Sequence, residues 1–320
     1  VQMNFGTDPE YVVYDSQNRP IPAHKVGIRS KLKKHRIGND GAYFRDGYAV
    51  ELNVHPSHCR QTMSFRVQRG LQRVAQHLQK YGYHLGTSAA FLINLKKDMA
   101  RAPADVRQFG CEPSYCAHDL VTKTPPIDAM THPYRYTGAH LHFSTRYDAP
   151  TPWLDDPATY PDIIKLLDQY VGLPLTCVYH SPEQYLRRKF YGQAGEFRPQ
   201  VYTRYPDGKP LKRGLEYRTP GPELWNAPWM ASLILGVARD VIRQFPRLRK
   251  TLDTGRVTAV RHAIDTGYRR WVLLKDLPRY PRHIWRKAMV RAGHPDYMGP
   301  QCLILADHDA IMEGYTGFSM

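Results

Sequence analysis

Short segments that alternate polar with apolar side chains recur far apart along this chain of 320 residues, and they constrain its fold more than any other feature. They are residues 4–14, 42–54, 137–144 and 214–219. Alternation with a period of two is typical of strands that bury one face. Because long stretches of chain separate the segments, we expect a sheet assembled from distant pieces.

Helical periodicity fills much of the sequence between these strands. Residues 64–81 place apolar side chains at steps of three and four, as in a helix that buries one face. Residues 161–171 and 222–244 open with proline and acidic side chains, which favour a helix start. The sequence contains no repeats or Ser/Gly-rich linkers, so we expect no division into independent domains.

The composition describes a globular and strongly basic protein. Lys and Arg exceed Asp and Glu by 45 to 29, which gives a net charge of +16. Such a field attracts nucleotides, polyphosphates and nucleic acid, although a solubilising surface would explain it equally. Five scattered cysteines favour a reducing cytoplasm over a disulfide framework. No apolar run reaches the roughly 20 residues that cross a bilayer, so we expect no membrane partner.

Carboxylates stand in the first two predicted strands. Asp8 and Glu10 are two residues apart in GTDPEYVVYD and would share one face of an extended strand. Like charges this close favour a cation between them, and Mg²⁺ prefers such oxygen ligands. Glu51 lies among apolar neighbours in YAVELNV and needs a metal or a charged partner if it is buried. The alternatives are a solvated strand edge for the pair and a salt bridge to arginine for Glu51.

Two later strands carry further polar side chains on one face. In GAHLHFS, His140, His142 and Ser144 alternate with apolar residues, and such histidines either bind a metal or are hydrogen-bonded core residues. In GLEYRT, Glu216 and Arg218 share a face. They form either a simple ion pair or a metal ligand beside a guanidinium that holds a phosphoryl group.

A glycine-containing basic segment, RRKFYGQAGEFRP, lies between these two strands. Its cations include Arg187, Arg188 and Arg198, and clustered cations suit phosphates or carboxylates. A basic surface loop is the alternative. The segment is not a Walker A loop, since GxxxxGK[ST] is absent.

The order of these motifs along the chain resembles the catalytic domain of glutamine synthetase and glutamate-cysteine ligase. The blocks GTDPEYVV, DGYAVELNVHPSHC, GCEPSYCAHD, YTGAHLHFS, KFYGQAGEFRP and GLEYRTPGPELW are more closely similar to the carboxylate-amine ligases encoded by tailed phages. The similarity spans residues 5–245. It implies a catalytic domain over residues 1–245, and we expect a basic, helical region over residues 246–320 that packs on this domain or extends it.

The resemblance implies an α+β fold in which a curved antiparallel sheet holds Mg-ATP on its concave face and helices cover the outer face. It assigns metal binding to Asp8, Glu10, Glu51, His140 and Glu216. It assigns contacts with ATP to His140, Ser144, Arg187, Arg188, Arg198 and Arg218, and catalysis to Arg218, Arg198 and His142. Asp8 departs from the family pattern, because relatives usually carry Glu there.

The implied reaction is amide formation through an acyl phosphate, with ATP and two or more Mg²⁺ ions, or Mn²⁺ in their place. The acid and amine are small molecules or peptides, and the motifs do not choose among an amino acid, a cell-wall peptide, a protein side chain and an amine on a nucleobase. The oligomeric state is open, and the resemblance places the enzyme in the cytoplasm of a phage-infected bacterium.

Two other functions remain open from the sequence. One is phosphoryl transfer on the same fold, as in a guanidino kinase. The other is nucleic-acid binding without catalysis, through the basic surface and the aromatic and basic residues that alternate after residue 267.

Overall fold

Antiparallel strands form three sheets in the computed structural model, which describes residues 3–266 apart from 110–112, 124–126, 147, 149, 180 and 205–209. The first sheet has the order β1 (Met3–Thr7), β12 (Leu141–Thr145), β14 (Pro210–Tyr217), β13 (Glu196–Arg204), β9 (Ser114–Cys116) and β10 (Thr122–Lys123). The second has the order β3 (Pro20–Ile21), β2 (Glu10–Tyr14), β6 (Ala49–Val54), β5 (Gly41–Asp46) and β4 (His35–Arg36), and β7 (His84–Gly86) also pairs with β2. A small third sheet pairs β11 (Tyr134–Tyr136) with β8 (Ala90–Leu92).

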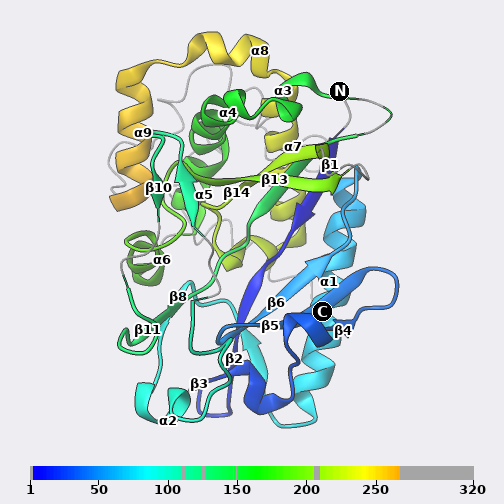
Figure 1. The fold of residues 1–320 in the computed structure, drawn as a ribbon, viewed down its shortest axis with the longest axis vertical. Coiled ribbons are helices and arrows are strands. Elements are labelled where there is room, and N and C mark those ends of the chain that lie inside the picture. Colours follow the sequence, from blue (N-terminus) through cyan, green and yellow to red (C-terminus); the bar gives the residue numbers. More distant parts are fainter. Residues whose placement is uncertain are drawn as a thin grey trace, which may run out of the picture.

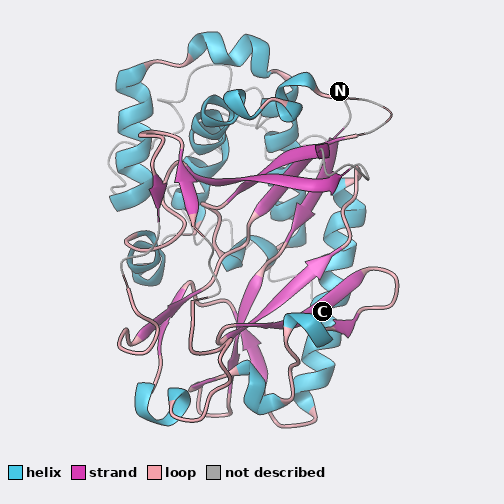
Figure 2. Cartoon of the chain, in the orientation of Figure 1, coloured by secondary structure: helices cyan, strands magenta, loops and turns pink. Residues whose placement is uncertain are grey.

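Helices complete the described part of the chain, and Figures 1 and 2 show most of them gathered around the first sheet. The α-helices are α1 (Arg60–Gln79), α2 (Leu95–Met99), α3 (Pro152–Asp155), α4 (Tyr160–Leu167), α5 (Leu173–Val178), α6 (Pro182–Arg188), α7 (Pro228–Arg243), α8 (Phe245–Leu248) and α9 (Thr254–Thr266). A π-helix, η4 (Asp168–Gly172), joins α4 to α5. The 3₁₀ turns are η1 (Ala23–Val26), η2 (Lys31–Lys33), η3 (Pro157–Thr159), η5 (Pro222–Trp225) and η6 (Arg249–Thr251).

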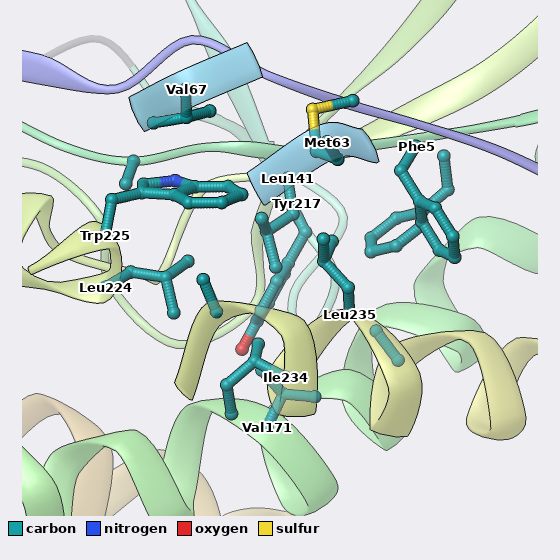
Figure 3. Close-up of a cluster of buried hydrophobic side chains, with 14 of the residues drawn as sticks. Phe5, Met63, Val67, Leu141, Val171, Tyr217, Leu224, Trp225, Ile234 and Leu235 are labelled. Carbon is teal, nitrogen blue, oxygen red and sulfur yellow. The ribbon is translucent and has the colours of Figure 1, made fainter. Parts of the chain in front are cut away.

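The core lies between the first sheet and the helices α1 and α7. Leu141 and Phe143 of β12 are fully buried on the helix side, while the histidines that alternate with them lie on the other face. In Figure 3, Met63 of α1 and Leu235 of α7 approach Leu141 from the helix layer. Each fully buried apolar side chain contributes about 1.5–3 kcal/mol to stability. This packing fixes β12, and with it the polar side chains on its opposite face.

The segment expected to be one strand over residues 4–14 is two strands that belong to different sheets. β1 pairs with β12, whereas β2 pairs with β6. Asp8 and Pro9 lie between them, and proline has no N–H with which to continue a ladder. The Pro9 carbonyl accepts from the Leu52 amide at 3.0 Å instead. Asp8 and Glu10 therefore do not share a strand face, which corrects the expectation from their spacing.

The other expected elements are present with shifted bounds. Residues 42–54 form the β5–β6 hairpin, residues 64–81 lie mostly within α1, and residues 161–171 fall in α4 and η4. The helix expected over residues 222–244 is instead the 3₁₀ turn η5 followed by α7, which begins at Pro228. The fold class is confirmed: helices pack on antiparallel sheets in an α+β arrangement.

The described part of the expected C-terminal region, residues 246–266, is helical and packs on the rest of the chain. Leu248 joins the main core, and Ile264 of α9 packs with Leu173 of α5. The domain boundary at residue 245 stays a prediction, and residues 267–320 lie outside the described part. No helix among the described residues is long and apolar enough to span a membrane.

Candidate metal and phosphate site

A first cluster of possible metal ligands forms where three distant segments meet. Asp8 comes from the break between β1 and β2, His140 immediately precedes β12, and Glu216 lies on β14. One ligand atom from each lies within 4.8 Å of the others. The Nδ1 atom of His140 is 3.1 Å from Asp8 Oδ1 and 3.4 Å from Glu216 Oε1. Two carboxylates and an imidazole facing one point suit a divalent cation.

A second cluster lies on the second sheet and consists of three carboxylates. Glu10 of β2 stands directly opposite Glu51 of β6, and Asp46 ends β5 at the hairpin. Their carboxylate oxygens lie within 4.8 Å of one another. The sequence reasoning missed Asp46. The available signal was the Asp-Gly pair that turns the chain back into the strand carrying Glu51.

Burial, and after it mutual repulsion, raises the pKa of each carboxylate in the second cluster. Burial, followed by the charges of Asp46 and Asp8, raises the pKa of Glu10 to about 8, against a smaller effect of the hydrogen bond from the Gly138 amide at 2.7 Å. Burial and the neighbouring carboxylates raise the pKa of Glu51 well above its usual range, and burial also raises the pKa of Asp46. Three carboxylates that all resist ionisation fit a site for a hard cation such as Mg²⁺, which would relieve their repulsion.

The first cluster has the opposite electrostatic character. Burial alone would raise the pKa of Asp8, but the charges of His142 and His140 outweigh it and lower that pKa well below its usual range. Burial opposes charge on His142, yet Asp8 raises the pKa of this histidine, whose Nε2 lies 3.1 Å from Asp8 Oδ2. Burial lowers the pKa of His140. When Nε2 carries the ring proton, the Nδ1 lone pair of His140 is available to a metal.

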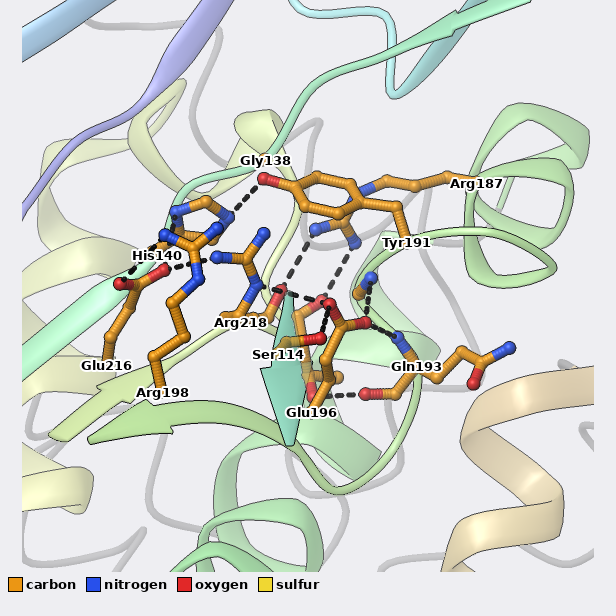
Figure 4. A network of polar contacts seen from close by, with 12 residues as sticks. Ser114, Gly138, His140, Arg187, Tyr191, Gln193, Glu196, Arg198, Glu216 and Arg218 are labelled. Carbon is orange, nitrogen blue, oxygen red and sulfur yellow. Dashed lines mark hydrogen bonds and ion pairs between the residues drawn. The ribbon is translucent and has the colours of Figure 1, made fainter. Parts of the chain in front are cut away.

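The surroundings of His140 orient its ring. Its Nε2 contacts the hydroxyl of Tyr191, so Nδ1 faces the carboxylates (Figure 4). Gly138 passes close by: a Cβ there would lie 3.0 Å from His140 Nε2 and 2.9 Å from the guanidinium of Arg187. Only glycine leaves room for this packing. A hydrogen bond to the second ring nitrogen is the usual way to fix a histidine ligand.

Arg218 is held between two carboxylates. Its Nη1 is 2.6 Å from Glu216 Oε1, and its Nε is 3.2 Å from Glu196 Oε1, as Figure 4 shows. Glu196 in turn accepts hydrogen bonds from Ser114 and from the Gly192 amide, at 2.8 and 2.6 Å. This network gives a buried guanidinium one orientation beside the first cluster. Glu196, in GEFRP, is a second site residue that the sequence reasoning missed.

Arg198 of β13 also reaches the first cluster. It stands opposite Glu216, and its Nη1 is 3.7 Å from Glu216 Oε2, the oxygen that accepts from Gln200 at 2.6 Å. Ser144 lies two residues beyond His142 on β12. The structure thus brings these residues to one face of the first sheet.

Two of the expected phosphate ligands direct their guanidinium groups at backbone carbonyls. The guanidinium of Arg187 donates to the backbone carbonyls of Arg218, Thr219 and Pro220 at 3.0–3.1 Å. Arg188 donates to the carbonyl of Ile264 in α9. Arg187 therefore holds the backbone of residues 218–220 in place through hydrogen bonds. Arg188 connects α6 to α9 through a hydrogen bond.

Comparison with known families identifies a match over residues 129–273, a little under half of the chain. The matching family is described as Phage phiEco32-like COOH.NH2 ligase-type 2. This stretch includes His140, Arg198, Glu216 and Arg218. The resemblance to phage carboxylate-amine ligases is thereby confirmed. A comparison with curated proteins finds no match.

A solved structure shares the fold at low sequence identity. A bifunctional glutathione synthetase from Pasteurella multocida aligns with a TM-score of 0.52 and 11% identity over 98% of this chain and 49% of that one. This chain thus spans about half the length of that protein. A structure described as a novel glutamine synthase homolog aligns with a TM-score of 0.44 and 15% identity over 97% of this chain and 71% of that one.

Proposed function

We propose that this protein, a relative of the phage carboxylate-amine ligases, joins a carboxylate to an amine with ATP and Mg²⁺. The single observation that carries the proposal is the pair of adjacent ligand clusters, Asp8–His140–Glu216 and Glu10–Asp46–Glu51, beside the fixed guanidinium of Arg218. The family match supplies the type of reaction.

The donor sets of both clusters fit Mg²⁺. Carboxylate oxygens dominate them, and the imidazole of His140 completes the first. When bound, two or more Mg²⁺ ions, or Mn²⁺ in their place, would neutralise charge on the phosphates of ATP. Glu216 of the first cluster and the three carboxylates of the second lie on strands of the two large sheets.

The chain's own residues would then orient the reactants. Arg218, held by Glu196 and Glu216, would present its planar fork to the phosphoryl group, and Arg198 would add a second positive charge. His142, held by Asp8 and by the hydroxyl of Tyr202 at 3.0 Å, would keep Asp8 in position. Arg187 would hold the backbone carbonyls of residues 218–220 in place.

The reaction takes place in two steps. A carboxylate oxygen of the acid attacks the γ-phosphorus of ATP, the bond to the β-phosphate oxygen breaks, and an acyl phosphate and ADP form. The amine nitrogen then attacks the acyl carbon, phosphate leaves with the bonding pair, and the amine loses a proton. The fixed cations would stabilise the tetrahedral oxyanion.

Acceptors of several kinds fit this chemistry, among them an amino acid, a peptide and an amine on a nucleobase. The exposed basic side chains Lys31, Lys33 and Lys34 around η2 support contact with a polyanion such as nucleic acid. The aromatic and basic residues after 267 lie outside the described part of the chain. We place the enzyme in the cytoplasm of a phage-infected bacterium.

The test is incubation of the full chain with ATP, Mg²⁺ and a mixture of acids and amines, followed by mass spectrometry. We expect a product lighter by one water than the sum of an acid and an amine, with ADP and phosphate released. Glu10→Gln and Glu216→Gln should each lower the rate at least about 100-fold, because each removes a ligand from one cluster. Glu183→Gln, at an exposed position in the first turn of α6, is the matched control.

Other outcomes would point elsewhere. A stable phosphorylated product without an amide would identify a phosphotransferase. Salt-sensitive nucleic-acid binding without ATP consumption for any acid and amine would identify a binding protein. Full activity of both cluster variants would contradict the proposed metal ligands.

A further inference from the structure

Two stretches of the sequence that lack acidic residues contact each other in the fold. Residues 16–39 and 52–97 contain several Lys and Arg side chains but no Asp or Glu. The first stretch includes η1, η2 and β4, and the second includes α1. They meet where Nε2 of His77 in α1 lies 2.9 Å from the carbonyl of Val26 in η1. The mixture of charge signs that is usual on a protein surface is therefore missing here.

Several exposed cations on these stretches have no acidic partner. By contrast, Arg66 and Arg69 of α1 pair with Asp40 at 3.5 and 2.9 Å. Such unpaired charges repel one another and gain from contact with a polyanion. We refer to them, together with the nearby Tyr81, as the basic face. The cations that form no ion pair within the described part of the chain are Arg29, Lys33, Lys34, Arg36 and Arg73.

Contacts around Tyr43 of β5 bring the parts of the basic face together. His35 of β4 stacks on the Tyr43 ring with the ring centroids 4.7 Å apart. The amide of Arg29 donates to His35 Nε2 at 3.2 Å. Burial raises the pKa of Tyr43, against a smaller effect of the positive charges of Arg29 and Arg73. Residues 29–36 and α1 thus contribute cations to one continuous surface.

Exposed apolar side chains accompany these charges. Tyr81, just after α1, is 54% exposed, and its hydroxyl would lie 3.4 Å from a Cβ at Gly27. Leu32 of η2 is 95% exposed. Aromatic rings among cations offer stacking to unpaired bases. The C-terminal half of α1 exposes Gln72 and Gln76 rather than the large apolar residues that a membrane-binding helix would present.

We propose that the basic face binds single-stranded nucleic acid, with its cations on the phosphates and Tyr81 stacked on a base. The charges attract any polyanion, and the exposed ring favours a strand whose bases are free to stack. Binding follows from the basic face alone and stands apart from the proposed ligase reaction. The face also lies outside the C-terminal region to which the sequence pointed.

The experiment measures binding of a fluorescein-labelled oligothymidylate to the full chain by fluorescence anisotropy, in EDTA, without ATP and at several salt concentrations. A length of about 20 nucleotides exceeds the usual site of one domain. The competitors are a duplex and an abasic strand of the same length, and vesicles of phosphatidylserine and phosphatidylcholine in equal parts. At equal concentrations of negative charge, each should compete at least threefold less well than unlabelled oligothymidylate.

Two triple variants locate the binding. Lys33→Gln/Lys34→Gln/Arg36→Gln removes charge from the basic face but keeps Lys31, whose ammonium lies 5.5 Å from the centroid of the Phe44 ring. It should weaken binding at least tenfold. It should also lower the slope of log Kd against log salt by about 2, because each phosphate contact with a single strand contributes about 0.7. The control, which lowers the net charge equally at exposed positions and should change Kd less than threefold, is Arg243→Gln/Arg247→Gln/Lys250→Gln.

Substitutions of Tyr81 test the stacking separately from the charges. Tyr81→Ala should weaken binding of the oligothymidylate at least threefold, while the salt slope and the Kd of the abasic strand stay unchanged. Tyr81→Phe keeps the ring and should bind as the wild type does. If the basic-face triple variant does not fold, the two Tyr81 variants still decide.

The proposal is overturned if the oligothymidylate does not bind at low salt, or if the duplex, the abasic strand or the vesicles compete as well as it does. It is also overturned if the control triple variant weakens binding as much as the basic-face variant. Binding of Mg-ATP, measured in parallel, separates the two claims. Nucleic-acid binding without Mg-ATP binding would contradict the ligase and leave the basic face standing. Mg-ATP binding without nucleic-acid binding would do the reverse.

Discussion

At the scale of single residues, the two clusters differ in what balances their carboxylates. Burial alone would raise the pKa of Asp8 and of Glu216, but the neighbouring histidines outweigh it at Asp8, and the histidines with Arg218 outweigh it at Glu216, so both pKa values are lowered. Glu10 and Glu51 face each other across two strands, and burial raises the pKa of both. The second cluster is therefore the one whose charge depends most on a bound cation.

This difference predicts a pH-dependent stability for the metal-free protein. The pKa of Glu10 is about 8 when folded, above its ordinary value of 4.5, so its contribution is fully present below pH 4.5 and is lost as pH rises through 8. In EDTA, the Tm should fall between pH 6 and pH 9. Glu10→Gln should make the decline shallower, and Mg²⁺ should raise Tm more at pH 9 than at pH 6.

Thermal unfolding followed by circular dichroism would measure this, with Glu183→Gln as the exposed control. A Tm in EDTA that stays constant or rises between pH 6 and pH 9 would contradict the assigned burial of the cluster. So would an unchanged pH slope in Glu10→Gln.

At the scale of elements, the π-helix η4 anchors the strand that carries Glu216 and Arg218. Asp168 of η4 is fully buried and accepts from the hydroxyl of Tyr217 at 2.8 Å, while His118 Nε2 lies 3.3 Å from its other oxygen. Gly172 makes room for this contact, because a Cβ there would lie 2.4 Å from the Tyr217 hydroxyl. The π-helix thus places the Asp168 carboxylate, and the space left by the missing side chain of Gly172, next to Tyr217 of β14.

Loss of this anchor should destabilise the fold. Tyr217→Phe removes one donor from a buried carboxylate, and we expect it to lower the free energy of unfolding by about 1–3 kcal/mol. Urea denaturation measures the change. Tyr115→Phe, on the exposed face of β9, is the matched control and should change the value by less than about 0.5 kcal/mol. Equal effects of the two substitutions would show that the Asp168 contact does not anchor β14.

The local sequence patterns predicted where strands lie and which side chains share a face better than they predicted which strands pair with one another. The alternation in GAHLHFS placed His140 and His142 opposite the buried Leu141, as observed. The same reasoning failed at Asp8 and Glu10, because Pro9 ends one ladder and the partner strands lie more than 30 residues away. The spacing of residues within a strand predicts which side chains share a face, but it does not predict which sheet the strand joins.

Contacts between distant elements also explain the residues that sequence reasoning missed. Asp46 becomes a candidate ligand only when β5 folds back on β6 beside β2. Glu196 becomes the second holder of Arg218 only through the pairing of β13 with β14. Conversely, Arg187 resembled a phosphate ligand in a basic loop, but the backbone carbonyls it binds lie about 30 residues further along the chain.

At the scale of the whole molecule, the candidate site lies where the two large sheets meet. The chain passes from β1 to β2, and so from one sheet to the other (Figure 1), at Asp8 and Pro9. The amide and carbonyl of Gly138 tie Glu10 to the segment that leads into β12. The second sheet supplies Glu10, Asp46 and Glu51, while the first cluster combines Glu216 of the first sheet with His140, just before β12, and with Asp8. The central claim is therefore that this junction holds two divalent cations per chain.

Counting bound Mn²⁺ by electron paramagnetic resonance, with and without a non-hydrolysable ATP analogue, tests this claim most directly. We predict two Mn²⁺ ions per wild-type chain in the presence of the analogue. Asp8→Asn and Glu51→Gln should each retain one, because they affect different clusters, and Glu183→Gln should retain two. A wild-type chain that binds fewer than two ions, or both variants retaining two with unchanged affinity, would contradict the account.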